Sequence, residues 1–343
     1  MSLLVTGGVG FVGSHFVRAA VEAGRQVVIL DDLSGSAAAG AARVGAAGAD
    51  CAIDQQALER ITSLPGVTLQ IGDIGDSALV SSLCRTHGVT ALLHFAGKIQ
   101  VGESVRRPEL HFDINFARAL SLLEAVRHAG VGQVVFSSTA AVYGTPTIVP
   151  IPESARCEPD SPYGRSKRAF EWALLSAEVA HGLRWAALRY FNAAGAHPDG
   201  SLREAHHPET HLIPLALDAG LGKGAPLSIF GSDYPTPDGT CIRDYIHVWD
   251  LAQAHLLALA ELERGHSLGP LNLGTGHGYS VQQVLQAASE VLGRPVPQIQ
   301  AARRPGDPPQ LIADPSAARE RLCFIPRRSD LHVLLEDALR SRR

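Results

Sequence analysis

A glycine-rich turn between a strand and a helix, near the start of the chain, is the feature that most constrains the fold. Three apolar residues, Leu3 to Val5, precede the run Gly7 to Gly13, and apolar residues then recur at helical spacing. Because glycine has no Cβ, the backbone can turn sharply there, and a pyrophosphate can approach the N–H groups at the start of the helix. The spacing Gly8-x-Gly10-x-x-Gly13 indicates a dinucleotide site, although such glycines also occur in ordinary strand–helix turns.

An acidic residue after the second predicted strand supports the dinucleotide interpretation. The strand Gln26 to Leu30 ends at Asp31 and Asp32, about 20 residues after the glycines. A carboxylate at this position accepts hydrogen bonds from an adenosine ribose and repels a 2′-phosphate. The sequence therefore predicts NAD, rather than NADP, as the cofactor.

The first half of the chain alternates strands and helices. This alternation predicts an α/β fold, a Rossmann-like doubly wound parallel sheet with a smaller C-terminal α/β substrate lobe. The Ala/Gly-rich run Ser36 to Asp50 interrupts the alternation, and we interpret it as a surface insertion. The other predicted strands are Val67 to Ile71, Ala91 to Phe95, Val134 to Phe136 and Trp185 to Leu188, and the other predicted helices are Glu103 to His128, Val281 to Leu292 and Ser329 to Arg340.

Composition excludes several classes of partner. The chain has 343 residues, 45% hydrophobic content and a formal net charge of −4, which allow a large core but give no general attraction for nucleic acid or acidic membranes. The five cysteines are scattered, which fits a reducing compartment and neither a disulfide framework nor a zinc site. No apolar run approaches the length of a bilayer-spanning helix, and the chain starts directly with a strand, so we expect a cytoplasmic protein with no membrane or nucleic-acid partner.

Tyr163 and Lys167 carry the candidate chemistry. Pro162 favours the first turn of a helix, so these two side chains, four residues apart, project from the same face. A tyrosine, whose ordinary pKa is about 10, is a useful base only if that pKa falls by roughly three units, which Lys167 and a positively charged nicotinamide ring would promote. Thr139, at the end of the preceding strand, could hydrogen-bond the same reacting hydroxyl. The same pair also fits an ordinary surface contact on a helix.

Seven motifs occur in a specific order between Leu3 and about Asp314: TGGVGFVGSH, HFAG, SSTAAVYG, SPYGRSK, RYFNAAGAHP, FGSDYPTPDGT and RDYIHV. In these motifs the chain resembles the extended short-chain dehydrogenase/reductase family and, within it, the UDP-glucose 4-epimerases. The resemblance implies NAD-dependent 4-epimerisation of a UDP-hexose through a transient 4-keto intermediate.

The same resemblance assigns roles to the candidate residues. Tyr163 would take the proton from the sugar 4-hydroxyl, Lys167 would hold the nicotinamide ribose and lower the tyrosine pKa, and Thr139 matches the family's Ser/Thr partner. The cofactor-binding residues that it implies are Gly7, Gly10, Phe11, Val12, Gly13, Asp31, Asp73, Ile74, Phe95, Ala96, Lys98, Tyr163, Lys167 and Tyr190.

The resemblance also implies a site for the UDP-sugar. Arg243 and Arg304 match phosphate-binding arginines, whose planar guanidinium suits a diphosphate, and Asp307 matches a carboxylate that binds the uridine ribose. Without the resemblance, Arg243-Asp244 reads as a local ion pair and Arg303-Arg304 as a solvated basic turn. The implied substrate-binding residues are Asn192, His211, Leu212, Phe230, Arg243, Tyr245, Arg304, Asp307 and Leu311.

Four positions depart from the family pattern. His211 stands where an asparagine is common, Lys98 follows HFAG without the usual spacing, and Asp32 replaces a frequent asparagine. Leu311 stands where some epimerases carry a tyrosine beside the sugar 2-position. The smaller leucine predicts some turnover of UDP-N-acetylglucosamine, unless a neighbouring loop fills the space.

We divide the chain into an NAD-binding Rossmann domain, residues 1–190 with 246–276 returning to it, and a UDP-sugar-binding lobe, residues 191–245 and 277–343. By resemblance to the family we expect a homodimer in which Glu103 to His128 and Arg165 to Ala180 pack across the interface.

Alternative activities fit parts of the same sequence. A nucleotide-sugar dehydratase or decarboxylase needs an acid beside Thr139, where this chain has Ala140 and Ala141. Another NAD-dependent nucleotide-sugar oxidoreductase stays open, as does a catalytically silent NAD-binding scaffold, although the presence of Tyr163 and Lys167 argues against the scaffold. The choice among UDP-hexose, UDP-N-acetylhexosamine and UDP-pentose substrates is also open.

One short segment gathers side chains that metals bind. Pro208 interrupts it, and its spacing lacks the one-face helical geometry of known metal sites. We therefore expect no metal and interpret the segment as a polar loop on the substrate side. Its residues are Glu204, His206, His207, Glu209 and His211.

Overall fold

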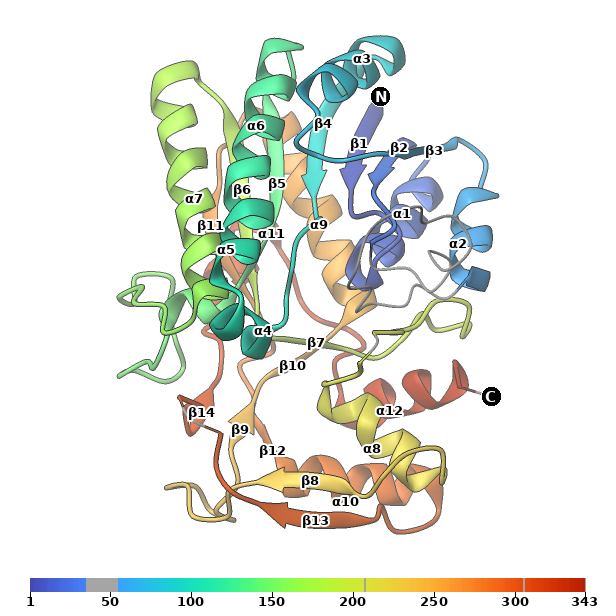
Figure 1. Cartoon of the computed structure of the whole chain (residues 1–343), viewed down its shortest axis with the longest axis vertical. Helices are drawn as coiled ribbons and strands as arrows, with labels where there is room; N and C mark the ends of the chain where they lie inside the picture. The colour runs from blue at the N-terminus through green and yellow to red at the C-terminus, as the bar shows by residue number, and fades with distance from the viewer. Residues whose placement is uncertain (35–54, 207, 305, 343) are drawn as a thin grey trace.

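A parallel sheet dominates the computed structural model, which describes residues 1–34, 55–206, 208–304 and 306–342 (Figure 1). Seven strands within these ranges lie in the order β11-β6-β5-β4-β1-β2-β3. The chain builds β2 and β3 on one side of β1 and then β4, β5 and β6 on the other, so the strand order reverses at β1, the point where open parallel sheets bind ligands. The strands are β1 Ser2–Thr6, β2 Gln26–Asp31, β3 Val67–Ile71, β4 Val89–His94, β5 Gln133–Thr139, β6 Arg184–Tyr190 and β11 Gly269–Leu273.

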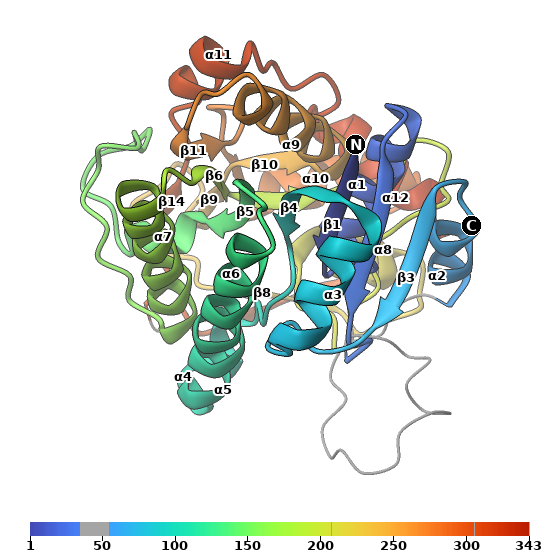
Figure 2. The ribbon, with the colours of Figure 1, turned by 90° about the horizontal axis from the view of Figure 1, so that it is seen from above.

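Helices cover both faces of this sheet, which explains its continuous apolar strands (Figure 2). One face packs against α1 (Phe11–Glu22), α2 (Gln55–Thr62), α9 (Val248–Glu263) and α11 (Ser316–Leu322). The other face packs against α3 (Ser77–His87), α6 (Ala119–His128) and α7 (Pro162–His181). The predicted Rossmann-like, doubly wound architecture is confirmed.

A smaller lobe lies beyond the carboxyl ends of the sheet strands (Figure 1). Its core forms where α8, α10 and α12 pack on β8 and on β10 (Tyr245–His247). Strands β8 and β13 pair in parallel, and β9 lies between β12 and β14. The elements are β8 Leu227–Phe230, β9 Ile242–Arg243, β12 Tyr279–Ser280, β13 Gln298–Ala301, β14 Gln310–Leu311, α8 Leu212–Gly220, α10 Val281–Leu292 and α12 Leu331–Arg340.

Two segments connect the lobe with the sheet side of the molecule. Strand β7 (Asn192–Ala194), just after β6, pairs in parallel with β10 (Tyr245–His247), just before α9. Within the stretch 277–343, which the sequence analysis placed in the lobe, α11 packs instead on α9 and β11 in the core beneath the sheet.

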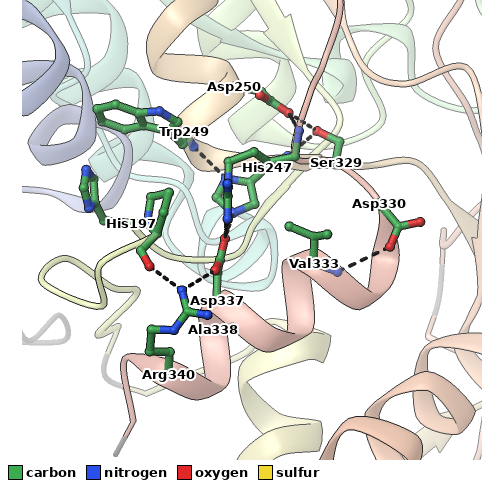
Figure 3. A network of polar contacts seen from close by, with 12 residues as sticks. His197, His247, Trp249, Asp250, Ser329, Asp330, Val333, Asp337, Ala338 and Arg340 are labelled. Carbon is green, nitrogen blue, oxygen red and sulfur yellow. Dashed lines mark hydrogen bonds and ion pairs between the residues drawn. The ribbon is translucent and has the colours of Figure 1, made fainter.

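A buried polar network joins the first turn of α9 to the last helix of the lobe (Figure 3). Nδ1 of His247 accepts a hydrogen bond from the Trp249 backbone N–H at 3.0 Å, which leaves Nε2 to donate to Asp337 Oδ2 at 3.2 Å. Arg340 donates to the other oxygen of Asp337 at 3.0 Å. Because His247 and Asp337 are both buried, the bond between them ties α12 to the start of α9.

The predicted helix from Glu103 to His128 is wrong as a single element. It is divided into α4 (Val101–Arg106), α5 (Pro108–Phe112), a π-helical segment (Asp113–Arg118) and α6. Proline removes a backbone N–H and disfavours helical geometry in the residue before it, and Arg107 has φ −136° and ψ 63°.

The remaining sequence predictions agree closely with the observed elements. Strand β3 and helix α10 have the predicted bounds, whereas β5 and β6 are longer than predicted, and β4 ends at His94 just before Phe95. The last helix begins at Leu331, because the Asp330 carboxylate accepts the backbone N–H groups of its first turn. The Ala/Gly-rich run from 36 to 50 lies outside the described residues.

Candidate active site

The glycine turn is packed so closely that side chains are excluded from it. Gly7 has φ +69°, and a Cβ there would lie 2.5 Å from the Ala96 backbone nitrogen. A Cβ on Gly13 would lie 2.1 Å from the Gly7 carbonyl oxygen. Gly10 is the N-cap of α1 and has no side chain, so the first N–H groups of the helix are open to a pyrophosphate.

Asp31 is a buried carboxylate at the end of β2. Its oxygens accept hydrogen bonds from the backbone N–H groups of Val9 at 3.3 Å and Leu33 at 3.0 Å. Burial raises the pKa of Asp31 to about 6. The two hydrogen bonds lower this pKa, but their effect is smaller than that of burial. The position beside the glycine turn suits a hydrogen bond to a ribose hydroxyl.

A cavity of about 420 Å³ opens at the carboxyl ends of the sheet strands. It brings together the glycine turn, the ends of β2, β3, β4 and β5, and the first turns of α7. Every residue that the sequence analysis assigned to the cofactor lines it: Gly7, Gly10, Phe11, Val12, Gly13, Asp31, Asp73, Ile74, Phe95, Ala96, Lys98, Tyr163, Lys167 and Tyr190.

Tyr163, Lys167 and Thr139 meet in this cavity. The Ser161 hydroxyl caps α7 by accepting the Gly164 N–H at 3.1 Å, which fixes the first turn that carries Tyr163. Lys167 Nζ donates to the Ser137 carbonyl oxygen on β5 at 3.0 Å. Thr139, the last residue of β5, hydrogen-bonds the Tyr163 side chain. The three side chains are therefore held by one helix and one strand end.

Burial controls the ionisation of both side chains on α7. It raises the pKa of Tyr163, and the hydrogen bond with Thr139 only partly opposes it. Burial also lowers the pKa of Lys167 to about 8. The lowering of the tyrosine pKa by Lys167 together with a positively charged nicotinamide ring stays a prediction.

Asn115 is a positioning residue that the sequence analysis missed. Its amide accepts the Lys98 N–H at 2.8 Å, donates to the Lys98 carbonyl at 2.9 Å and donates to Ser166 Oγ at 3.2 Å. These bonds fix the backbone of Lys98, whose side chain lines the cavity, next to the helix that carries Lys167. Asn115 belongs to the π-helical segment, and such segments are frequent at functional sites, but the apolar pattern predicted an ordinary α-helix.

The predicted substrate residues divide into three groups. Asn192 and His211 line the cavity, and the Asn192 side chain donates to the Asp244 carbonyl oxygen at 2.9 Å. Tyr245 and Leu212 pack into the core of the lobe. The remaining five lie on or near β8, β9, β13 and β14 in the lobe: Phe230, Arg243, Arg304, Asp307 and Leu311.

Two contacts organise the charged members of the last group. Arg243 forms an ion pair with Asp307, not with the adjacent Asp244. The Asp244 carboxylate instead accepts backbone N–H bonds, including that of Thr275 at 2.9 Å. The Arg304 guanidinium lies over the Phe230 ring, 4.0 Å from its centroid. The fold of the lobe therefore brings together two pairs whose members are far apart in the sequence. They are the ion pair Arg243–Asp307 and the stacked pair Arg304–Phe230.

Comparison with known proteins places this site in a family. A model of the NAD-dependent epimerase/dehydratase family matches residues 3–274. The chain belongs to this family. A UDP-glucose 4-epimerase of Azospirillum brasilense is 47% identical and covers 98% of this chain and 90% of the relative. The match confirms the resemblance to UDP-glucose 4-epimerases.

Solved structures of this epimerase/dehydratase type agree with the fold. The UDP-glucose 4-epimerase of Brucella ovis in complex with NAD has a TM-score of 0.89 and 42% identity, covering 98% of this chain and 97% of that one. The enzyme of Stenotrophomonas maltophila with bound NAD and formylated UDP-arabinopyranose has a TM-score of 0.91 and 37% identity, covering 100% and 98%. The predicted α/β fold and the family's NAD dependence are confirmed. No helix among the described residues has both the length and the apolar character needed to cross a membrane.

Proposed function

We propose that this chain catalyses the NAD-dependent 4-epimerisation of a UDP-hexose, interconverting UDP-glucose and UDP-galactose through a 4-keto intermediate. The observation that carries this proposal is the meeting of Tyr163, Thr139 and Lys167 in the cavity that contains the glycine turn. An active-site tyrosine beside a nicotinamide site suits proton removal from a hydroxyl that is being oxidised.

The residues of the cavity have distinct tasks in this reaction. The glycine turn and Asp31 would bind the pyrophosphate and the adenosine ribose of NAD, and Asp73 and Ile74, which line the same cavity, would contact the adenine. Bound NAD would supply the acceptor for the hydride from the sugar C4 and the donor that returns it to the other face. Lys167 binds the nicotinamide ribose. Tyr163 holds the proton of the 4-hydroxyl, aided by Thr139, and its raised pKa requires a nearby positive charge that an oxidised nicotinamide ring supplies.

The lobe binds the nucleotide and leaves the sugar free to turn. Arg243 and Arg304 bind the diphosphate with planar guanidinium groups, and Asp307 accepts hydrogen bonds from the uridine ribose. The ion pair between Arg243 and Asp307 holds both side chains in place before the substrate arrives. Asn192, on β7 between sheet and lobe, contacts the diphosphate from the cavity side.

Leu311 favours the acceptance of more than one UDP-sugar as substrate. It lies on β14, paired in register with Arg243 on β9, and packs against the buried cluster around Tyr143 and Ile151. A leucine leaves more room beside the sugar 2-position than a tyrosine would. UDP-N-acetylglucosamine and UDP-N-acetylgalactosamine are accordingly proposed as additional substrates.

An exposed apolar surface supports a homodimer. Val105, Phe112, Leu120, Trp172 and Val179 are all exposed on α4, α5, α6 and α7, on the same side of the sheet. These helices contact one another, and exposed apolar side chains on neighbouring helices are typical of a protein–protein interface. We also propose a cytoplasmic location, and a division into an NAD-binding domain, residues 1–190 with 246–276, and a UDP-sugar-binding lobe formed by the remainder except α11, which packs on the sheet core.

The test is an assay of purified protein with no added cofactor against UDP-galactose, UDP-N-acetylgalactosamine and UDP-arabinose. Conversion to the 4-epimer that is lost in Tyr163→Phe supports the proposal and ranks the substrates. Tyr234→Phe is a matched control, because the Tyr234 hydroxyl has no hydrogen-bond partner among the described residues. Absence of conversion in protein that still contains NAD would favour a net oxidoreductase or a silent NAD-binding protein.

A further inference from the structure

Two Glu-x-His pairs lie together on the loop that leads into α8. The first pair is Glu204 and His206, and the second is Glu209 and His211. Pro208 separates the pairs in sequence, yet one carboxylate or imidazole atom from each of the four side chains lies within 4.8 Å of the others. Small side-chain movements would bring the four donors within reach of a single ion.

The side chains of the cluster lie at hydrogen-bond distances from one another. His211 Nδ1 is 2.7 Å from Glu204 Oε1 and 2.8 Å from Glu209 Oε1, and His206 Nδ1 is 3.1 Å from Glu204 Oε1. Ligands on a tetrahedral ion with bonds of about 2.0–2.1 Å lie about 3.3–3.4 Å apart. Outward movement of these side chains by about half an ångström therefore opens space for an ion.

Charge and donor type select the kind of cation. The Glu204 side chain is only 4% exposed, and without an ion the His211 imidazole, 2.7 Å away, is its positive partner. A divalent ion cancels the two carboxylate charges while both imidazoles stay neutral, which is the form that binds metal. Two imidazole nitrogens and two carboxylate oxygens suit Zn²⁺, whereas Mg²⁺ and Ca²⁺ prefer oxygen ligands alone.

We propose that Glu204, His206, Glu209 and His211 bind one divalent transition-metal ion of the zinc class. Glu204, His206 and His211 also line the cavity of the active site, and His211 is the N-cap residue of α8. The bound ion would tie the loop to the first turn of this helix and add a fixed positive charge to the cavity wall. The proposal departs from the polar-loop interpretation of the sequence, and it places the ion at the wall of the active-site cavity.

The test is direct binding of zinc chloride to the full-length enzyme, containing its bound NAD, after chelator treatment and dialysis. We expect one equivalent of zinc retained after gel filtration, measured by elemental analysis, and a rise in melting temperature with Zn²⁺ but not with Mg²⁺. Calorimetric titration of His206→Gln and Glu204→Gln should show zinc affinity reduced by more than about 10-fold, since even loss of an outer-shell partner costs about that much.

A matched control distinguishes this site from exposed histidines. His332 lies 3.0 Å from Glu290, but both side chains are about half exposed, and His332→Gln should bind zinc as the unmodified chain does. If Glu204→Gln fails to fold, the more accessible Glu209→Gln takes its place. Zinc retention below about one tenth of an equivalent, or equal affinity in the His206, Glu209 and His332 variants, would overturn the proposal.

Discussion

Replacing Glu171 by glutamine should destabilise the protein strongly, although the number of non-hydrogen atoms stays the same. The Glu171 carboxylate is fully buried on α7 and binds Arg189 on β6 through two bonds of 2.9 and 2.7 Å. It also accepts bonds from Ser138 Oγ at 2.6 Å and Arg168 Nη1 at 2.6 Å. Glutamine would turn an NH₂ group toward these N–H donors and leave the Arg189 guanidinium, 1% exposed, without a counter-charge.

The expected loss is about 3–5 kcal/mol in the free energy of unfolding, the usual cost of breaking one side of a buried ion pair. Guanidinium chloride unfolding, fitted with a common slope, measures it. The control is Glu22→Gln, which removes a half-exposed pair with Arg18 and should cost less than about 1 kcal/mol. A loss below about 1 kcal/mol for Glu171→Gln would refute the reasoning, because it would show that Arg189 does not depend on this charge.

The same pair predicts a pH dependence with a defined sign. Burial by itself raises the pKa of Glu171, but the hydrogen bonds and charge of Arg189 outweigh burial and hold the pKa below its usual 4.5. A carboxyl group with a lowered pKa stabilises the folded state above its ordinary pKa, and this contribution is lost as the pH falls through the folded pKa. The stability difference between the unmodified chain and Glu171→Gln should therefore be constant near neutral pH and shrink on acidification below 4.5.

Two further substitutions test the cofactor and sugar sites. Gly13→Ala forces a Cβ to within 2.1 Å of the Gly7 carbonyl oxygen, so NAD content, read from absorbance after denaturation, should fall and stability should drop by about 1–3 kcal/mol. Gly132→Ala, where a Cβ meets nothing within 4 Å, should change neither, and NAD content equal in both variants would contradict the account of the glycine turn. Leu311→Tyr should reduce turnover of UDP-N-acetylgalactosamine by about 10-fold or more relative to UDP-galactose, and an unchanged ratio would show that Leu311 does not limit the pocket.

The cofactor site could be predicted from sequence because its parts are local. The glycine turn, Asp31 and the Tyr163–Lys167 spacing each follow from a few neighbouring residues, and the carboxyl ends of parallel strands necessarily meet at one edge. The break before α5 was also available from Pro108, but the apolar period on both sides of it favoured one long helix. The spacing of apolar residues alone does not show that such a proline interrupts the helix.

The substrate side required information that no local pattern contains. Arg243 pairs with Asp307, 64 residues away, and Arg304 lies on Phe230, because β8 pairs with β13 and β9 with β14. Only the resemblance to a family identified these residues. Neither the local sequence patterns nor the family resemblance identified Asn115, because its role depends on bonds to the Lys98 backbone that exist only in the folded chain.

The most direct test of the proposed chemistry follows the hydrogen at C4 of the sugar. UDP-galactose labelled with deuterium at C4 is incubated with the purified enzyme in ordinary water without added NAD, and the UDP-glucose formed is analysed by mass spectrometry and NMR. Hydride transfer to tightly held NAD and back predicts full retention of deuterium at C4 of the product. Loss of the label to solvent, or its appearance in released NADH, would contradict epimerisation through a 4-keto intermediate in a closed site.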